Sequence, residues 1–242
     1  MKVNETMMET VIQMGEDKLF LRHNRVIPGR RTLLFVHGLG ETGACFREVF
    51  QDSRFDEFNL LAPDLVGYGK SSRPHPDGRG FDSHVKRLWK LLEKYHTHNL
   101  MVIGHSMGGD ITTLMCAADS QGIIKKYINI EGDVTQFDLF ISSEAVKAED
   151  KGNFLANARE LVKRNNNLSL PGEYKSEIGQ FYAGLSLPRV YCYGTRSLSE
   201  STQRFLKENH LDIMAFENAG HWLMIDKTAE FYSFLYEYMR HD

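Results

Sequence analysis

The residues of this sequence best suited to chemistry stand together at positions 104–108, which read Gly-His-Ser-Met-Gly. This segment follows an apolar run over 100–103 and precedes a predicted helix over 107–118. A serine two residues from a glycine on either side, between a strand and a helix, matches a nucleophile elbow, in which a sharp turn exposes the hydroxyl above a sheet. Glycine is needed at both flanks because the two backbones approach too closely for a Cβ. Ser106 is therefore the candidate nucleophile.

The elements that would position this serine follow from the apolar pattern of the chain. A hairpin is predicted over 11–22 around the turn at 15–17. Further strands are predicted over 32–36, 59–62, 100–103, 127–130, 189–193 and 211–216. Helices are predicted over 42–50, 85–95 (capped by Asp82 or Ser83), 107–118 and 226–239. This alternation predicts an α/β fold, a mostly parallel sheet with helices on both faces.

One segment, 134–187, interrupts the alternation of strands and helices. It lacks a clear buried strand and carries charged helical patterns, as over 153–164. We interpret it as a small helical cap inserted into a core formed by 1–133 and 188–242. A pair of ordinary connecting helices is the alternative.

The order of the elements, together with four local motifs, resembles the α/β-hydrolase family over about residues 10–240. The motifs are His-Gly-Leu-Gly at 37–40, Asp-Leu-Val-Gly-Tyr-Gly-Lys-Ser-Ser at 64–72, the segment at 104–108, and Ala-Gly-His-Trp at 219–222. The resemblance implies that the site residues follow the chain order Ser, acid, His. His221, in the loop before the last helix, is then the candidate base. Asp64 is expected to be structural.

The remaining histidines are expected to have other roles. His37 and His105 are expected to shape the site without transferring protons. Histidines in polar surroundings are expected to be solvated, namely His23, His75, His84, His210 and His241. His96 and His98 have no cysteine or carboxylate partner at ligand spacing, so no metal site is predicted.

The acid departs from the common pattern of the family. Most relatives place an aspartate shortly after the strand that follows the cap, where this chain has Ser197, and a hydroxyl cannot supply the negative charge. Some members, including a group of haloalkane dehalogenases, carry the acid at the end of the strand after the elbow helix. Glu131 matches that position and is the candidate acid, with Asp133 and Glu200 as alternatives.

An oxyanion hole is expected from backbone N–H groups, which require no particular side chain. One would be that of Met107, the residue after the nucleophile. The other would be that of Leu39, in the glycine-rich loop after an apolar strand.

A serine nucleophile, where dehalogenases and epoxide hydrolases of this fold use a carboxylate, indicates acyl transfer to water. The expected function is a carboxylesterase or lipase-like hydrolase of a small to medium apolar acyl substrate, without cofactor or metal. Alternatives are a slow-turnover ligand receptor, an acyltransferase, a thioesterase, a lactonase or a C–C bond hydrolase. An apolar acyl pocket is predicted from Leu39, Met107, Trp222, Leu223, Phe137, Leu139, Phe140, Phe154 and Phe181.

Composition restricts the partners that this chain is expected to bind. The 242 residues are 42% hydrophobic and 25% charged, with a formal net charge of -3 and no long basic run, which argues against nucleic acid. No apolar stretch is long enough to predict a membrane span, and the polar start of the chain lacks the pattern of a signal peptide. Three widely separated cysteines are typical of reduced thiols, so a cytoplasmic location is expected. The oligomeric state is left open.

Overall fold

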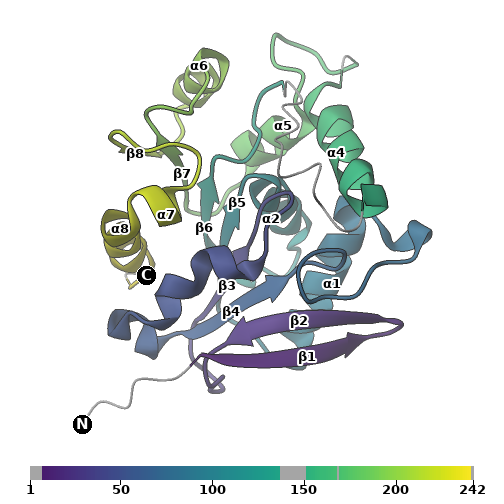
Figure 1. Ribbon diagram of the computed structural model, residues 1–242. Helices are drawn as coiled ribbons and strands as arrows, with labels where there is room; N and C mark the ends of the chain where they lie inside the picture. The colour runs from purple at the N-terminus through teal and green to yellow at the C-terminus, as the bar shows by residue number, and fades with distance from the viewer. Residues whose placement is uncertain (1–6, 137–150, 168, 241–242) are drawn as a thin grey trace.

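A single twisted sheet organises the computed structural model, which describes residues 7–136, 151–167 and 169–240 (Figure 1). In this part of the chain the sheet has eight strands in the order β1-β2-β4-β3-β5-β6-β7-β8. Their bounds are β1 Met8–Met14, β2 Asp17–His23, β3 Thr32–Val36, β4 Asn59–Asp64, β5 Leu100–His105, β6 Ile124–Ile130, β7 Arg189–Gly194 and β8 Ile213–Phe216. The pairs β1–β2 and β2–β4 are antiparallel and all other pairs are parallel, which confirms the predicted α/β fold.

The helices lie on both faces of this sheet (Figure 1). The α-helices described are α1 Phe81–Lys94, α2 Met107–Ala118, α4 Lys151–Asn165, α5 Glu177–Gly184, α6 Glu200–Glu208, α7 Leu223–Asp226 and α8 Thr228–Arg240. Three further turns are 3₁₀ helices: η1 Gly43–Phe50, η2 Ser53–Glu57 and η3 Pro76–Gly78. The predicted helix over 42–50 is therefore present but is of the tighter 3₁₀ kind, with Thr42 as its N-cap.

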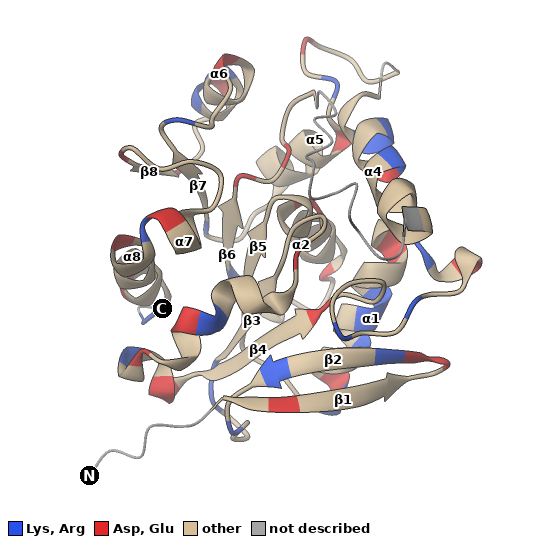
Figure 2. Cartoon of the chain, in the orientation of Figure 1, with Lys and Arg blue, Asp and Glu red and all other residues tan. Residues whose placement is uncertain are grey.

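Successive side chains of the central strands enter two different hydrophobic cores. In β3, Leu34 and Val36 pack with α1 and α2, whereas Leu33 and Phe35 pack with η1 and α8. All four side chains are fully buried. Neither β3 nor β5 contains a Lys, Arg, Asp or Glu, while Figure 2 shows these residues, of both signs, on the outer helices and on the β1–β2 hairpin. The continuous apolar runs in the sequence reflect this burial on both faces.

The start of α1 differs from the prediction that Asp82 or Ser83 caps it. The helix begins at Phe81, after Gly80 with a φ of 92°. The backbone N–H of Phe81 donates to Glu160 Oε2 at 2.7 Å, and Glu160 belongs to α4. A carboxylate 79 residues away in sequence thus satisfies this helix end, which no local capping pattern could indicate.

The segment predicted as a cap contains α4 and α5 in its described part. Asn165 of α4 donates to Asp110 Oδ2 of α2 at 2.8 Å, and Asn165 also accepts from Ser176 Oγ at 2.5 Å. Both helices therefore pack over the helix that follows Ser106. The division of the chain into core and cap stays a prediction. Among the described residues, no helix combines the length and apolar character of a membrane span.

Two histidines that were expected to be solvated are instead buried, so that expectation is wrong for them. His23 is 8% exposed and His84 only 1% exposed. Burial lowers the pKa of His84 to about 3, helped by the nearby charge of Arg87, so this ring is neutral at physiological pH. The polar residues next to His84 in the sequence did not indicate that its side chain lies on the buried face of helix α1.

Asp64 closes the loop at the end of β4 and is fully buried. Its Oδ1 accepts from Gly43 N at 2.9 Å and its Oδ2 from Lys70 N at 2.9 Å. It also forms an ion pair with Arg22 of β2. These contacts agree with the structural role expected for Asp64.

We predict that Asp64→Ala destabilises the protein by about 3–5 kcal/mol, because it removes the buried partner of the Arg22 guanidinium and leaves only Glu9, 4.0 Å away. Urea unfolding followed by circular dichroism measures this loss. Glu48→Ala is the matched control, since it removes an exposed ion pair with Arg47 and should cost less than about 1 kcal/mol. Equal losses in the two variants would contradict the role given to Asp64.

Candidate active site

Ser106 stands on a strained turn between β5 and α2. Its φ of 52° and ψ of −126° lie in a region that residues other than glycine rarely adopt. The backbone holds this conformation at both ends, because Ser106 N donates to Ile130 O at 2.8 Å and Gly109 N donates to Ser106 O at 2.7 Å. The serine is thereby fixed directly beside the end of β6. The geometry is that of the predicted nucleophile elbow.

The two glycines flanking the turn have no room for a side chain. A Cβ on Gly104 would lie 2.2 Å from Thr112 Oγ1 and 2.4 Å from Gly108 O. A Cβ on Gly108 would lie 2.2 Å from Val36 O, in the neighbouring strand β3. The close approach of strand and helix backbones, inferred from the sequence, is therefore present.

His221 and Glu131 form a hydrogen-bonded pair beside this turn. His221 Nδ1 lies 2.8 Å from Glu131 Oε2, and the Glu131 side chain is only 6% exposed. Because a carboxylate accepts, Nδ1 of the neutral ring carries the proton and Nε2 keeps its lone pair. This is the tautomer that a general base requires.

The second oxygen of Glu131 is held by the end of β7. Glu131 Oε1 accepts from Gly194 N at 2.7 Å and from Ser197 Oγ at 2.5 Å. Ser197, which stands where most relatives have the acid, here donates a hydrogen bond to the carboxylate on the adjacent strand. The backbone of Glu131 has a φ of 49°, which turns its side chain at the strand end.

The alternative acids lie elsewhere. Burial, with the nearby charge of Glu131, raises the pKa of Asp133 to about 7, and its backbone N–H donates to Asp110 Oδ1 at 2.8 Å. Glu200 is exposed in the first turn of α6. The partner of the His221 ring is Glu131.

Of the two residues predicted to supply the oxyanion hole, Met107 follows the serine in the chain, and Leu39 belongs to a loop that lies against it. Met107 is the first residue of α2, so its N–H has no acceptor within the helix. Leu39 follows Gly38, and a Cβ built on Gly38 would lie 3.1 Å from Ser106 Cβ. The loop after β3 therefore passes against the serine. His37 anchors this loop by accepting from Leu65 N at 2.9 Å through Nε2.

Two of the residues predicted to line an apolar pocket, Leu39 and Phe154, pack together in the described part of the chain. Phe154 and Ala158 of α4 are buried and pack against Leu39. In contrast, Phe181 is 41% exposed, and Leu223 is buried in the core on the η1 and α8 face, so neither supports the pocket. Phe137, Leu139 and Phe140 lie outside the described residues. Trp222 is 45% exposed beside His221, and the two rings meet edge to face.

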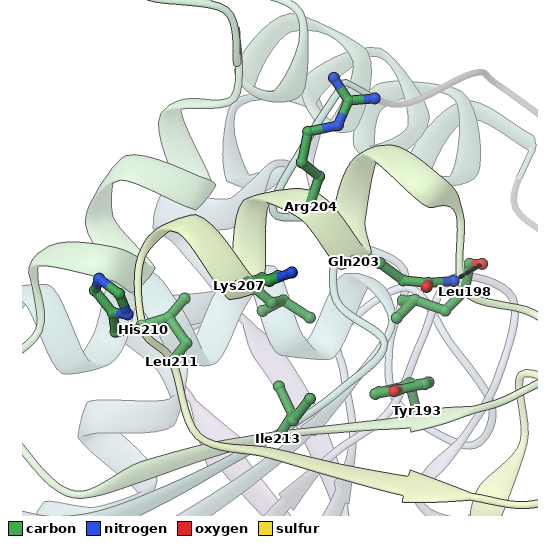
Figure 3. Close-up of a pocket in the computed structure, with 9 residues that line it drawn as sticks. Tyr193, Leu198, Gln203, Arg204, Lys207, His210, Leu211 and Ile213 are labelled. Carbon is green, nitrogen blue, oxygen red and sulfur yellow. Dashed lines mark hydrogen bonds between the residues drawn. The ribbon is translucent and has the colours of Figure 1, made fainter.

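A separate groove lies between α6 and β8 (Figure 3). Ile213 and Tyr193 form its apolar floor, and Lys207 and His210 lie along its rim (Figure 3). None of its lining residues is a serine, cysteine or carboxylate, so the groove offers no hydrolytic set. Within the described ranges, no cluster of three or more His, Cys, Asp or Glu side chains is arranged to hold a metal ion.

Sequence reasoning missed Glu41, which lies in the centre of this region. It follows Gly40, one residue beyond the His-Gly-Leu-Gly motif, and its carboxylate accepts from His105, Gly38 and Trp222. A carboxylate in a glycine-rich loop has many ordinary explanations. Only its proximity to the motif could have drawn attention to it.

Comparisons with known proteins agree with this fold. A sequence model of the α/β hydrolase fold matches residues 31–209. Lipase 3 of Moraxella sp. (strain TA144) is 32% identical over 102 residues, which are 42% of this chain and 31% of that protein. The hydrolase YugF of Bacillus subtilis (strain 168), described as uncharacterized, is 33% identical over 85 residues, 35% of this chain and 31% of that protein. The matched segments thus span about a third of the length of these relatives.

Solved structures resemble the whole chain. A thioesterase domain from the curacin biosynthetic pathway has a TM-score of 0.71 and 18% identity, covering 95% of this chain and 99% of that one. The N-acyl homoserine lactonase AidH has a TM-score of 0.73 and 17% identity, with 97% of each chain covered. The 2-hydroxy-6-oxo-6-phenylhexa-2,4-dienoate hydrolase of Rhodococcus sp. strain RHA1 has a TM-score of 0.72 and 16% identity, covering 97% and 99%. This likeness shows the fold.

The chain belongs to the α/β-hydrolase fold family. Its relatives and structural neighbours include proteins named as lipases, a thioesterase, a lactonase and a C–C bond hydrolase.

We predict that Gly108→Ala destabilises the protein by more than about 2 kcal/mol, because the new methyl group overlaps the carbonyl of Val36 and must push α2 away from β3. Thermal unfolding measures this effect. Gly184→Ala is the matched control at the end of α5, where an added Cβ meets nothing within 4 Å. A Gly108→Ala variant as stable as the control would contradict the close packing described for the elbow.

Proposed function

We propose that the protein is a serine hydrolase that cleaves an ester or related acyl bond through an acyl-enzyme intermediate. Ser106 is the proposed nucleophile, His221 the general base and Glu131 the acid that orients it. The backbone N–H groups of Leu39 and Met107 are the proposed oxyanion hole. This chemistry needs neither a metal ion nor an organic cofactor.

The observation that carries this proposal is the bond from His221 Nδ1 to Glu131 Oε2, at 2.8 Å, beside a serine on an elbow. A carboxylate on Nδ1 directs the lone pair of the imidazole to Nε2 and stabilises the imidazolium that forms during reaction. A surface histidine in a loop would have no reason to meet a side chain that is only 6% exposed. The pair therefore supports a catalytic over a purely structural interpretation.

The proposed reaction has two steps. His221 Nε2 accepts the proton of Ser106 as its oxygen attacks the carbonyl carbon, and the alcohol leaves with that proton. Water then gives a proton to His221 as its oxygen attacks the acyl carbon, the bond from that carbon to Ser106 Oγ breaks, and His221 returns the proton to the serine oxygen as the acid leaves. Each oxyanion donor typically contributes about 3 kcal/mol to the stabilisation of the transition state.

The substrate class is proposed from a buried apolar cluster that packs against the loop beside the serine. Phe154 and Ala158 of α4 pack against Leu39, the proposed oxyanion residue, which favours a small to medium apolar acyl group. The names of the relatives add lipid esters, thioesters, lactones and C–C bonds as candidates. A carboxylesterase or lipase-like activity is the first choice among them.

A panel of 4-nitrophenyl esters of increasing chain length tests the substrate class. Repeated turnover supports a hydrolase, whereas one slow covalent event without turnover supports a ligand receptor. Added alcohols that compete with water for the acyl group would identify an acyltransferase. The proposed cytoplasmic location follows only from cysteine usage and is tested by fractionation.

We predict that Ser106→Ala abolishes ester turnover and labelling by a fluorophosphonate, while the unfolding midpoint stays within a few degrees of the wild type. Removing the nucleophile leaves the elbow backbone unchanged, because its hydrogen bonds involve N and O of residue 106. Gel fluorescence and a spectrophotometric ester assay measure both effects. Full turnover by the pure variant would exclude Ser106 as the nucleophile.

We predict that Glu131→Gln lowers kcat by about 1,000-fold or more, since it removes the charge that orients His221. Asp133→Asn is the matched control, because Asp133 stands two residues away and donates only its backbone N–H to Asp110. It should lower kcat less than about 10-fold. If the Asp133 variant lost more activity than the Glu131 variant, the acid would be wrongly assigned.

A further inference from the structure

A second carboxylate, that of Glu41, lies next to the proposed catalytic residues without belonging to them. Its Oε2 accepts from Gly38 N at 2.9 Å and from His105 Nδ1 at 3.0 Å. Its Oε1 accepts from Trp222 Nε1 at 2.6 Å. Three donors from three segments far apart in sequence thus converge on one side chain that is 16% exposed.

The hydrogen bonds of His105 determine its protonation. Its Nε2 lies 2.9 Å from the backbone oxygen of His221, and a carbonyl oxygen can only accept. Its Nδ1 faces Glu41, which also accepts when ionised. Both ring nitrogens therefore donate, so His105 is an imidazolium. His37 contrasts with it, because its Nε2 accepts from Leu65 N and that ring is neutral.

The charges around the pair agree with this assignment. Burial alone would raise the pKa of Glu41, but the charge and hydrogen bond of His105, with the donors Gly38 and Trp222, lower it to about 2. Burial lowers the pKa of His105, and Glu41 with the carbonyl of His221 outweighs it, so that the pKa is raised. The other titratable groups facing His105 are Glu131, His37 and the ring of His221, 4.6 Å away between centroids. The thiol of Cys45 in η1 faces Glu41, and burial together with that carboxylate raises the pKa of the thiol, so it stays protonated.

We propose that Glu41 and protonated His105 form a positioning pair that holds three loops together: the oxyanion loop through Gly38, the elbow through His105 itself, and the histidine loop through His221 and Trp222. This inference rests on the proposed function, in which those loops carry the oxyanion donor, the nucleophile and the base. Neither member touches the reacting atoms, so both act through their neighbours.

The pair fixes the positions of the Leu39 peptide and the His221 ring, on which the proposed reaction depends. Anchoring Gly38 N orients the next peptide, whose N–H belongs to Leu39. The hydrogen bond from His105 to the carbonyl oxygen of His221 fixes the position of the His221 ring. That ring must reach both Glu131 and Ser106. Because the pair is neutral overall, it orders these loops without adding a net charge beside the developing oxyanion.

A neutral amide cannot replace the Glu41 carboxylate. Glutamine has one acceptor oxygen, whereas the wild-type side chain accepts three hydrogen bonds on two oxygens. In Glu41→Gln, the NH₂ group must face at least one of these donors. The NH₂ group then opposes the N–H donor of Gly38 or Trp222, or His105 must lose its Nδ1 proton to accept from it.

The first experiment measures kcat and KM of Glu41→Gln on the best ester of the panel. We expect kcat to fall about 30–100-fold with KM within about threefold, because misplaced loops weaken the transition state more than ground-state binding. Glu57→Gln is the matched control. Glu57 also accepts hydrogen bonds from an aromatic residue, Tyr236, and from a cation, Arg31. It lies in η2, away from Ser106.

The second experiment reads the protonation of His105 directly, by ¹⁵N NMR of histidine-labelled protein with His105→Gln for assignment. In the wild type, both ring nitrogens should give imidazolium shifts at pH values above about 6.5, the ordinary pKa of histidine, where a free histidine becomes neutral. In Glu41→Gln, one nitrogen should become imine-like at a lower pH than in the wild type, because the charge that raises the pKa of His105 is gone. A purely structural role for Glu41 would leave these signals unchanged.

The outcomes separate this inference from the proposed function. A neutral His105 in the wild type at about pH 7, or a Glu41→Gln variant with unchanged kcat, overturns the positioning pair. Turnover by Ser106→Ala would overturn the proposed function, while the spectrum of His105 would still decide its charge. If Glu41→Gln fails to fold, the wild-type spectrum alone decides between the imidazolium and the neutral ring.

Discussion

The carboxylate of Glu131 is the contact on which the arrangement of the candidate site depends. It stands at the end of β6, with one oxygen on His221 and the other on Gly194 and Ser197 of the β7 end. Because β5, β6, β7 and β8 are parallel neighbours, their carboxyl ends meet along one edge of the sheet. One side chain at that edge can therefore reach the loops that follow two other strands. In the proposed function the acid stands on β6 and not on β7, and Ser197 at the end of β7 donates a hydrogen bond to it.

Most of the fold could be predicted because its signals are local. Burial of β3 and β5 on both faces requires continuous apolar runs, and those runs are visible in the sequence. The elbow could be predicted because Gly104 and Gly108 are required by contacts within one strand–turn–helix unit and its neighbour β3. Glu131 could be proposed only through a family resemblance. The absence of a carboxylate at 197 indicated that the acid lay elsewhere, without indicating where.

The features that escaped prediction depend on contacts between distant parts of the chain. The start of α1 is set by Glu160, a carboxylate of α4, and no capping pattern near Phe81 indicates it. His84 is buried because of how α1 packs, although its sequence neighbours are polar. The three donors to Glu41 come from positions 38, 105 and 222, and no spacing rule connects them. A sequence pattern indicates the periodicity of one element, whereas these contacts depend on how several elements pack together.

The site holds two carboxylate–histidine pairs whose chemistry differs through the group on the far nitrogen of each ring. His221 and His105 both donate from Nδ1 to a glutamate. The Nε2 of His105 meets a backbone carbonyl, which only accepts, so that nitrogen must also carry a proton. The Nε2 of His221 need not carry a proton. In the proposed mechanism it faces a hydroxyl that can give up a proton. In these proposals, the same residue pair yields a fixed cation in one place and a base in the other, since the third partner determines whether the ring can lose its second proton.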